Sequence, residues 1–330
     1  MDVIDRLRLD VPVLQAGMGG GVSGPRLAGA VAAAGGLGTL GLTSPQRLRA
    51  GIASVRAQAP GRAVAVNLLM PFVRKRHIAT CLAERIDVAV LFFGGSPALV
   101  AALHGVGAFV MAQVGTRQEA AAALAWGVDG LIAQGREAGG HLLGREPGLA
   151  FLARVLPIAG DRPVLLAGGM ANADDTRTAL AAGAAGVVAG TRFMLTHESD
   201  AHPLYQQRVL AADATLETTL FGFGWPARHR VVANAATQRW CRDDGRVRTL
   251  PGFINRTSAP IGHVVNDALI AWLPRLQRAW LPLLAATPPL RGMAAAVVDS
   301  TPLYAGASAL RMSSVISAKA AVDLLAGRHG

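Results

Sequence analysis

Short apolar segments recur along the first 190 residues of the chain, and most of them are followed by a turn or a helix-like segment. Each segment is apolar throughout, which is typical of strands covered on both faces in a parallel sheet. The predicted strands are residues 11–15, 38–40, 63–67, 88–93, 108–114, 130–133, 163–167 and 186–189. Eight such units favour a closed (β/α)8 barrel, the TIM barrel. An open doubly wound sheet is the alternative, because the repetition of strand and helix units does not show whether the sheet closes into a barrel.

Helix-start residues stand between these strands. Ser44-Pro45 and Ser96-Pro97 each place a hydroxyl before a proline, a pattern typical of the first turn of a helix. Other predicted helices cover 25–34, end at Glu84, begin at Thr116 and cover 172–182. Only a Gly-rich loop is predicted behind the strand at 130–133.

The character of the chain changes between about residues 220 and 301, where proline is frequent and four of the five tryptophans occur. We interpret this part as a smaller helical insertion domain, with a helix over 264–280. The motif YAGAS at 304–308 and a final helix are expected to return to the barrel. The predicted organisation is a barrel over 1–219, an insertion domain over the active site at 220–303, and a returning segment over 304–330.

Composition excludes several classes of protein. Apolar residues make up 52% and charged residues 16% of the 330 residues, which excludes intrinsic disorder. Two cysteines exclude a disulfide scaffold. The net charge of +11 comes from scattered arginines without the clustering that nucleic-acid binding requires. We expect no membrane span or signal peptide and therefore a cytoplasmic protein.

Catalytic and binding residues of a barrel lie at the C-terminal ends of its strands. Gly168-Gly169 and Gly190-Thr191 follow the last two predicted strands, where barrels commonly bind phosphate because glycine lets backbone N–H groups approach the anion. The alternative is that these glycines only turn the chain. The remaining strand-end residues are Gln15 to Met18, Asn67, Gln113, Gln134 and Glu137 to His141.

His141 ends a loop with three glycines and is the candidate proton-transfer residue, since histidine titrates near neutral pH. A histidine on a surface loop is the alternative. His197 and His202 lie five residues apart, with Glu198 and Asp200 between them, and could suggest a metal site. The alternative is that they lie at the capped or solvated start of a helix, so we expect no metal site. The motifs of serine hydrolases and P-loop proteins are missing from the sequence. Residues 17–21 lack the spacing of a dinucleotide fingerprint.

Five segments together resemble the FMN-dependent nitronate monooxygenases, formerly called 2-nitropropane dioxygenases, and the related enoyl-[acyl-carrier-protein] reductases. The segments are PVLQAGMGGGVSGPRLAGAVAAAGGLGTLG, AVNLLMP, GVDGLIAQGREAGGH, PVLLAGGM and AAGAAGVVAGTRFMLTHES. The resemblance covers about residues 3–210 and resumes at YAGAS. It implies an FMN-dependent monooxygenase that oxidises nitronates or nitroalkanes with O2.

The resemblance also implies roles for individual residues. Ala16, Gly17 and Met18 would run along the isoalloxazine edge, and Asn67 would hydrogen-bond the flavin. Gln113, Gln134, Gly139 and Gly140 would complete the flavin contacts. The FMN phosphate would lie on Gly168, Gly169, Gly190 and Thr191, and His141 would be the catalytic base. The partners implied are a small-molecule substrate and O2. We expect neither nucleic acid nor membrane as a partner, and the assembly considered is a homodimer.

Three positions depart from the family pattern. Gln113 stands where a basic residue is frequent, Leu142 where arginine is frequent after the GGH, and Ala307 where glutamine is usual in YAGAS. A basic residue near the flavin N1 would stabilise the reduced flavin, so Gln113 puts the redox potential in question. The alternatives are an NAD(P)H-dependent enoyl reductase, another flavin oxidation of specialised metabolism, and a flavin-binding protein without turnover.

Overall fold

Eight short parallel strands form the centre of the molecule. The computed structural model describes residues 3–259 and 276–328. The strands are β1 (Val13–Gln15), β2 (Thr39–Leu40), β3 (Ala65–Leu69), β4 (Val88–Phe92), β5 (Phe109–Val114), β6 (Gly130–Gln134), β8 (Val164–Ala167) and β9 (Gly186–Ala189). They neighbour one another in the order β1-β9-β8-β6-β5-β4-β3-β2, and a parallel bridge between Leu14 and Leu37 joins the two ends. The predicted TIM barrel is confirmed, and no strand bound differs by more than two residues.

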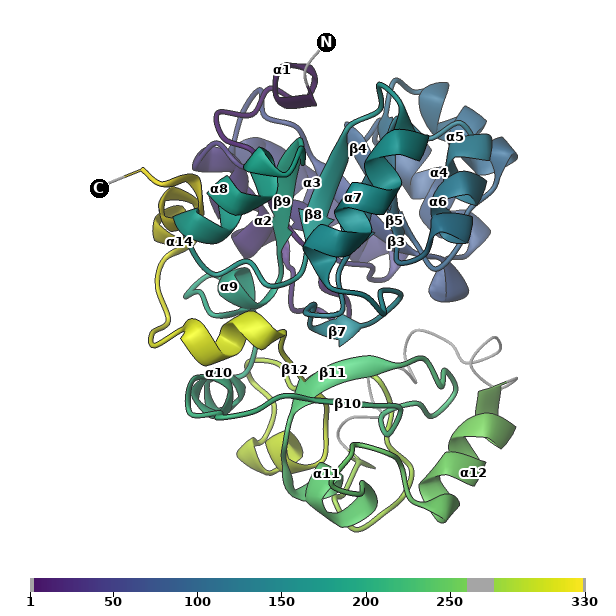
Figure 1. Cartoon of the computed structure of the whole chain (residues 1–330), viewed down its shortest axis with the longest axis vertical. Helices are drawn as coiled ribbons and strands as arrows, with labels where there is room; N and C mark the ends of the chain where they lie inside the picture. The colour runs from purple at the N-terminus through teal and green to yellow at the C-terminus, as the bar shows by residue number, and fades with distance from the viewer. Residues whose placement is uncertain (1–2, 260–275, 329–330) are drawn as a thin grey trace.

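Helices surround the barrel (Figure 1). They are α2 (Pro25–Ala33), α3 (Pro45–Gln58), α4 (Lys75–Ala83), α5 (Pro97–His104), α6 (Arg117–Ala125), α7 (Gly148–Ala159), α8 (Ala173–Ala181) and α14 (Ala318–Ala326). The predicted helix starts are confirmed: α3 and α5 begin on their prolines, and the Ser96 hydroxyl accepts from the Leu99 N–H. A short α1 (Val3–Leu7) precedes the barrel.

Helix α7 was not predicted. It begins behind Pro147, which offers no side-chain cap, and follows directly on the Gly-rich loop after β6. It also contains Pro157, a residue that disfavours helix interiors. The helix is stable because Phe151, Leu152 and Val155 are buried in the barrel core, so tertiary packing overrides the local signals.

The barrel has an inner and an outer core. Val13 belongs to the outer cluster between strands and helices, whereas its neighbour Leu14 belongs to the inner cluster. Leu131 and Ile132 divide in the same way. Both faces of the strands are thus buried, which explains why the segments are apolar throughout instead of alternating.

The chain leaves the barrel after β9 and returns only at α14, which packs on α2 and α8 and so supplies the eighth barrel helix. The excursion begins with a short helix, Thr191–Met194, that lies against the barrel, and then forms the lower lobe in Figure 1. Its helical elements are α9 (Thr191–Met194), α10 (Pro203–Leu210), α11 (Ala235–Trp240), α12 (Thr249–Ser258), η3 (Ala295–Asp299) and η4 (Ala307–Arg311). The helix predicted over 264–280 lies mostly outside the described residues.

A small antiparallel sheet accompanies these helices, so the helical description of the insertion is incomplete. Its strands are β10 (Leu216–Thr218), β11 (His229–Val232), β12 (Leu303–Tyr304) and β7 (Gly140–His141). Strand β7 comes from the loop behind β6, and its pairing with β11 joins the barrel to the lower lobe. Strands of two to four residues leave too little periodicity to detect in the sequence.

Candidate active site

A cavity of about 890 Å³ lies at the C-terminal ends of the barrel strands, and residues of the lower lobe form its other wall. All thirteen candidate residues line it. They are Ala16, Gly17, Met18, Asn67, Gln113, Gln134, Gly139, Gly140, His141, Gly168, Gly169, Gly190 and Thr191. Phe223 to Trp225, Ala285 to Pro288 and Leu290 to Met293 contribute from the lower lobe. This volume suits a bound cofactor together with a small substrate.

The loop between β8 and α8 has a defined backbone shape. Gly168 and Gly169 have φ of +106° and +82°, a region that L residues with side chains rarely adopt. The loop is fixed behind them, because the Asp175 carboxylate accepts from the Ala171 N–H at 2.7 Å and from the Asn172 N–H at 3.2 Å. A residue with a side chain would be strained in this backbone conformation, so glycine is required at both positions. The backbone of both glycines therefore lines the cavity.

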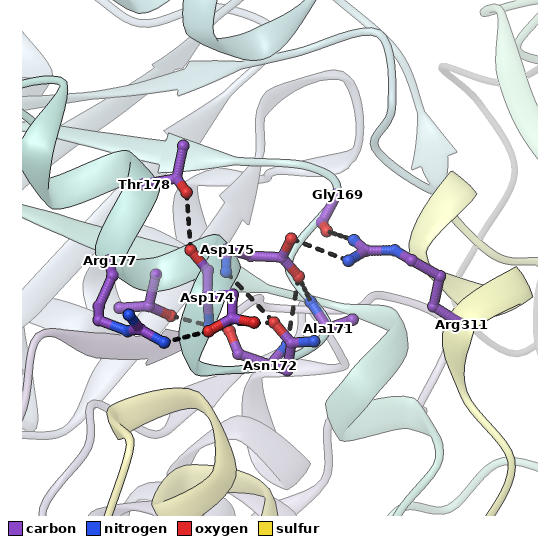
Figure 2. Close-up of polar contacts among 9 residues, drawn as sticks. Gly169, Ala171, Asn172, Asp174, Asp175, Arg177, Thr178 and Arg311 are labelled. Atoms are coloured by element: carbon purple, nitrogen blue, oxygen red, sulfur yellow. Dashed lines mark hydrogen bonds and ion pairs between the residues drawn. The ribbon is translucent and has the colours of Figure 1, made fainter.

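Arg311, from η4, also holds this loop (Figure 2). Its guanidinium donates to the Gly169 carbonyl at 2.6 Å and pairs with Asp175 at 2.9 Å. By contrast, Arg177 pairs with Asp174 on the exposed side of α8, away from the loop. The C-terminal segment thus supports the Gly-Gly turn directly, a contact that the sequence analysis missed.

Gly190 and Thr191 form the second half of the candidate phosphate site. A Cβ atom on Gly190 would meet only the Cβ of Ala16, at 3.7 Å, so the space in front of Gly190 is open. The Thr191 hydroxyl accepts from the Gly306 N–H at 2.9 Å, and its own hydrogen is therefore free to point elsewhere. Two glycine turns and a hydroxyl lining one cavity fit a phosphate group.

Two predicted flavin contacts also bind the protein itself. The Asn67 amide donates to the Gly17 carbonyl at 2.8 Å, which fixes the loop after β1. The Gln134 amide donates to the His141 carbonyl at 3.0 Å and accepts from the Leu143 N–H at 2.7 Å. Gln134 therefore shapes the His141 loop in addition to lining the cavity.

His141 lies in an aromatic enclosure. Its ring stacks on Trp225 with centroids 4.0 Å apart and an interplanar angle of 29°. The rings of His229 and Tyr304 lie at 5.4 Å and 5.3 Å, and Phe93 lies at 6.4 Å. Burial, reinforced by the neighbouring His229, holds the pKa of His141 well below the usual 6.5. The imidazole is therefore neutral near pH 7 and able to accept a proton.

Trp225, His229, Tyr304 and Phe93 were not among the predicted site residues. The sequence indicates no role for His229 beyond its place in the insertion, whereas the β7–β11 register places it directly opposite His141. Phe93 has a φ of +61°, which is rare for an aromatic residue and indicates backbone strain beside the site. The only sequence signal was the gathering of tryptophans, which did not specify Trp225.

Charged side chains clamp the His141 loop to the lower lobe. Arg228 pairs with Glu217 at 2.8 Å and also donates to the Gly144 carbonyl. Arg230 pairs with the same carboxylate and donates to the Arg136 carbonyl at 2.8 Å. The Leu142 N–H donates to the Arg228 carbonyl at 2.8 Å. Because these groups are partly buried, they fix the loop better than exposed pairs would.

The departures from the family pattern have structural counterparts. Gln113 lines the cavity, whereas the arginines that line it, Arg47, Arg74 and Arg291, come from other parts of the chain. Leu142 is buried, and the Ala307 N–H donates to the Glu137 carbonyl at 2.9 Å.

Among residues 3–259 and 276–328, no three histidine, cysteine or acidic side chains are grouped as a metal site. Over the same ranges, no helix has the length and apolarity to cross a bilayer.

The fold and the cavity define a (β/α)8-barrel protein with its binding site at the C-terminal strand ends. The family model described as nitronate monooxygenase matches residues 2–79 and 60–327. The nitronate monooxygenase of Pseudomonas aeruginosa is 33% identical over 267 residues, which are 66% of this chain and 76% of that protein. The chain therefore belongs to the nitronate monooxygenase family, a family of oxidoreductases.

Other similar proteins have different names. The (3aS,4S,5R,7aS)-5-hydroxy-7a-methyl-1-oxo-octahydro-1H-indene-4-carboxyl-CoA dehydrogenase of Mycobacterium tuberculosis is 35% identical over 238 residues, 70% of this chain and 65% of that protein's length. Nitroalkane oxidase from Streptomyces ansochromogenes superposes with a TM-score of 0.77 at 26% identity, covering 97% and 96% of the two chains. FabK from Thermotoga maritima shares the fold, with a TM-score of 0.76 at 24% identity, covering 99% and 94%.

Proposed function

We propose that this protein is an FMN-dependent oxidoreductase that oxidises a nitroalkane or nitronate, or a related carbon acid, with O2. The observation that carries the proposal is the neutral, enclosed imidazole of His141 lining the same cavity as two glycine turns that fit a phosphate. Membership of the nitronate monooxygenase family supports the same reading. FMN is favoured over FAD because its phosphate is terminal.

Gly168, Gly169, Gly190 and Thr191 would hold the FMN phosphate. Ala16, Gly17, Met18 and Asn67 would hold one edge of its ring system, and Gln113, Gln134, Gly139 and Gly140 the rest. When bound, the flavin supplies the electron transfer from substrate to O2. Trp225 and Phe72 would bind the apolar part of the substrate and exclude water.

His141 would perform the proton transfer. A nitroalkane is a weak carbon acid, so its α-carbon must lose a proton before oxidation. The C–H bond breaks, the electron pair stays on the nitronate, and the proton passes to a ring nitrogen of His141. The depressed pKa keeps the imidazole unprotonated and available at neutral pH.

Two measurements on the purified protein test the proposal. The cofactor is released by heat and identified by chromatography, and we expect FMN. The holoenzyme is then mixed anaerobically with NADH, NADPH, a nitroalkane and a nitronate in turn while the flavin spectrum is recorded. Bleaching by the nitro compounds alone supports the proposal. A protein that neither contains nor takes up FMN, or one bleached by NADH at the turnover rate, contradicts it.

A second candidate function is oxidation or reduction of a bulky acyl thioester. A 35%-identical relative is named a dehydrogenase of a bicyclic carboxyl-CoA. Arg47, Arg74 and Arg291 line the cavity and would attract the phosphates of such a carrier. This reading includes the enoyl-reductase alternative. Competition between a nitroalkane and free coenzyme A distinguishes the two functions, because only the second predicts inhibition at low coenzyme A concentration.

A further inference from the structure

His229 is a second buried imidazole behind His141. Strand β11 places it directly opposite His141 in the β7–β11 pairing. The two ring centroids lie 5.4 Å apart, with the rings inclined at 64°. The His229 side chain is fully buried, so it cannot be an alternative base that meets the substrate.

The hydrogen-bond partners of His229 define its tautomer. Its Nδ1 lies 2.9 Å from the Ala227 carbonyl, and a carbonyl can only accept, so Nδ1 carries the hydrogen. Burial lowers the pKa of His229 to about 4, which keeps the ring neutral at pH 7. Nε2 of His229 therefore presents a lone pair, and within the described residues no donor reaches it.

Nε2 of His141 is also buried without a hydrogen-bond partner among the described residues. The ring of Tyr304 also lies beside the two histidines, but its hydroxyl donates to the Ala286 carbonyl at 2.9 Å. Phe221, the remaining ring near His229, is apolar. The two neighbouring rings therefore contain one buried acceptor, Nε2 of His229, and one buried nitrogen with the capacity to donate, Nε2 of His141. Buried polar atoms are rarely left unpaired in native proteins.

We propose that His229 is a positioning residue for His141, with its Nε2 accepting a hydrogen bond from Nε2–H of His141. The centroid separation of 5.4 Å allows the two ring nitrogens to reach hydrogen-bond distance when both point along the line between the rings. This bond fixes the Nε2–H tautomer of His141 and leaves the lone pair on Nδ1. Nδ1 is then the atom that takes the substrate proton, much as a third group orients the base in a catalytic triad.

The inference rests on the proposed role of His141 as a base, but its first test needs no substrate. Protein labelled with ¹⁵N in histidine reports by NMR which ring nitrogens carry hydrogens, and His141→Asn identifies the His141 signals by their loss. We expect His141 as the Nε2–H tautomer and His229 as the Nδ1–H tautomer. A predominant Nδ1–H tautomer of His141 overturns the proposal, even if the enzyme oxidises nitroalkanes.

Two substitutions provide the kinetic test. Asn at position 229 retains an amide near the Nδ1 position, toward the Ala227 carbonyl, but offers no acceptor at the Nε2 position. Gln at the same position offers one. We expect His229→Asn to lower kcat/KM for a neutral nitroalkane at least tenfold, with His229→Gln within about threefold of wild type. Turnover of the preformed nitronate, which needs no base, should change little in either variant.

Equal losses in the two variants, or equal losses on the two substrates, indicate a structural role and overturn the proposal. Melting temperature and flavin content are measured for both variants. If neither variant folds, the tautomer of wild-type His141 alone decides. If wild type oxidises neither nitro compound, the proposed function fails, and the tautomer still confirms or rejects the positioning role.

Discussion

At the scale of single residues, His141, the proposed base, illustrates how enclosure keeps an imidazole neutral. An exposed histidine is partly protonated near neutral pH, and a protonated imidazole cannot accept a second proton. Stacking on Trp225 and burial beside His229 remove water from the ring, which disfavours the charged form. The imidazole of His141 is thus kept neutral by residues that lie far from it in the sequence.

Replacing His141 by Asn should separate proton transfer from substrate binding. Asn has a similar polarity and cannot take the proton, so kcat/KM for a neutral nitroalkane should fall by about 10² to 10⁴. Turnover of the preformed nitronate should fall much less. The measurement compares both substrates in wild type and variant at equal flavin content. Similar losses on the two substrates would show that His141 is not the base.

Gly190→Val tests the placement of the phosphate. The new Cβ meets only Ala16, at 3.7 Å, so the protein itself accommodates it, and the branched methyl groups extend into the open space before Gly190. We expect the Kd for FMN to rise at least tenfold while the melting temperature of the apoprotein stays within a few degrees. Unchanged FMN affinity in a folded variant would place the phosphate elsewhere.

At the scale of elements, the β8–α8 turn depends on support from outside the barrel. Arg311→Met removes the bonds to the Gly169 carbonyl and to Asp175. We expect FMN affinity to fall several-fold, because the Gly-Gly turn loses its fixed shape. Isothermal titration of the apoprotein measures the effect.

Arg177→Met is the matched control for this measurement. It removes an exposed pair with Asp174 on the same helix, where such pairs contribute roughly 0 to 1 kcal/mol. FMN affinity should be unchanged in this variant. If both variants weaken FMN equally, the effect comes from the lost positive charge and not from the turn.

The elements also show what a sequence can predict. The eight strands and the starts of α3, α5, α6 and α8 were predictable because apolar runs and capping residues act locally. The candidate residues that line the cavity were predictable because each lies within a barrel strand or in the segment that directly follows one. The β7–β11 pairing was not, since it joins two short segments distant in the chain and leaves no local pattern. Trp225 and His229 were missed for that reason.

At the scale of the whole molecule, the buried histidines make stability depend on pH. The unfolded chain binds protons at its histidines near pH 6.5, whereas folded His229 does so near pH 4 and folded His141 also well below 6.5. Between these values the unfolded state holds more protons, so the free energy of unfolding falls as pH decreases from about 6.5 toward 4. Each histidine contributes at most about 1.4 kcal/mol per pH unit.

Urea unfolding at a series of pH values measures this dependence, and His229→Gln provides the comparison. The variant lacks one of the two imidazoles whose pKa is lowered in the folded protein, so its stability should depend less steeply on pH between 6.5 and 4. The linkage assigned to His229 would be wrong if wild type and variant gave parallel curves.

The late return of the chain to α14 has a consequence for synthesis. The last barrel helix covers α2 and α8 only after the whole lower lobe has been made. Until then the nascent barrel exposes the apolar surface of α2, α8 and β1 that α14 later covers, and exposed apolar surface on incomplete domains favours aggregation. Deleting the lower lobe by truncation would remove the helix that covers this surface as well. A minimal barrel would require Met194 to be joined to Ala318 by a designed linker.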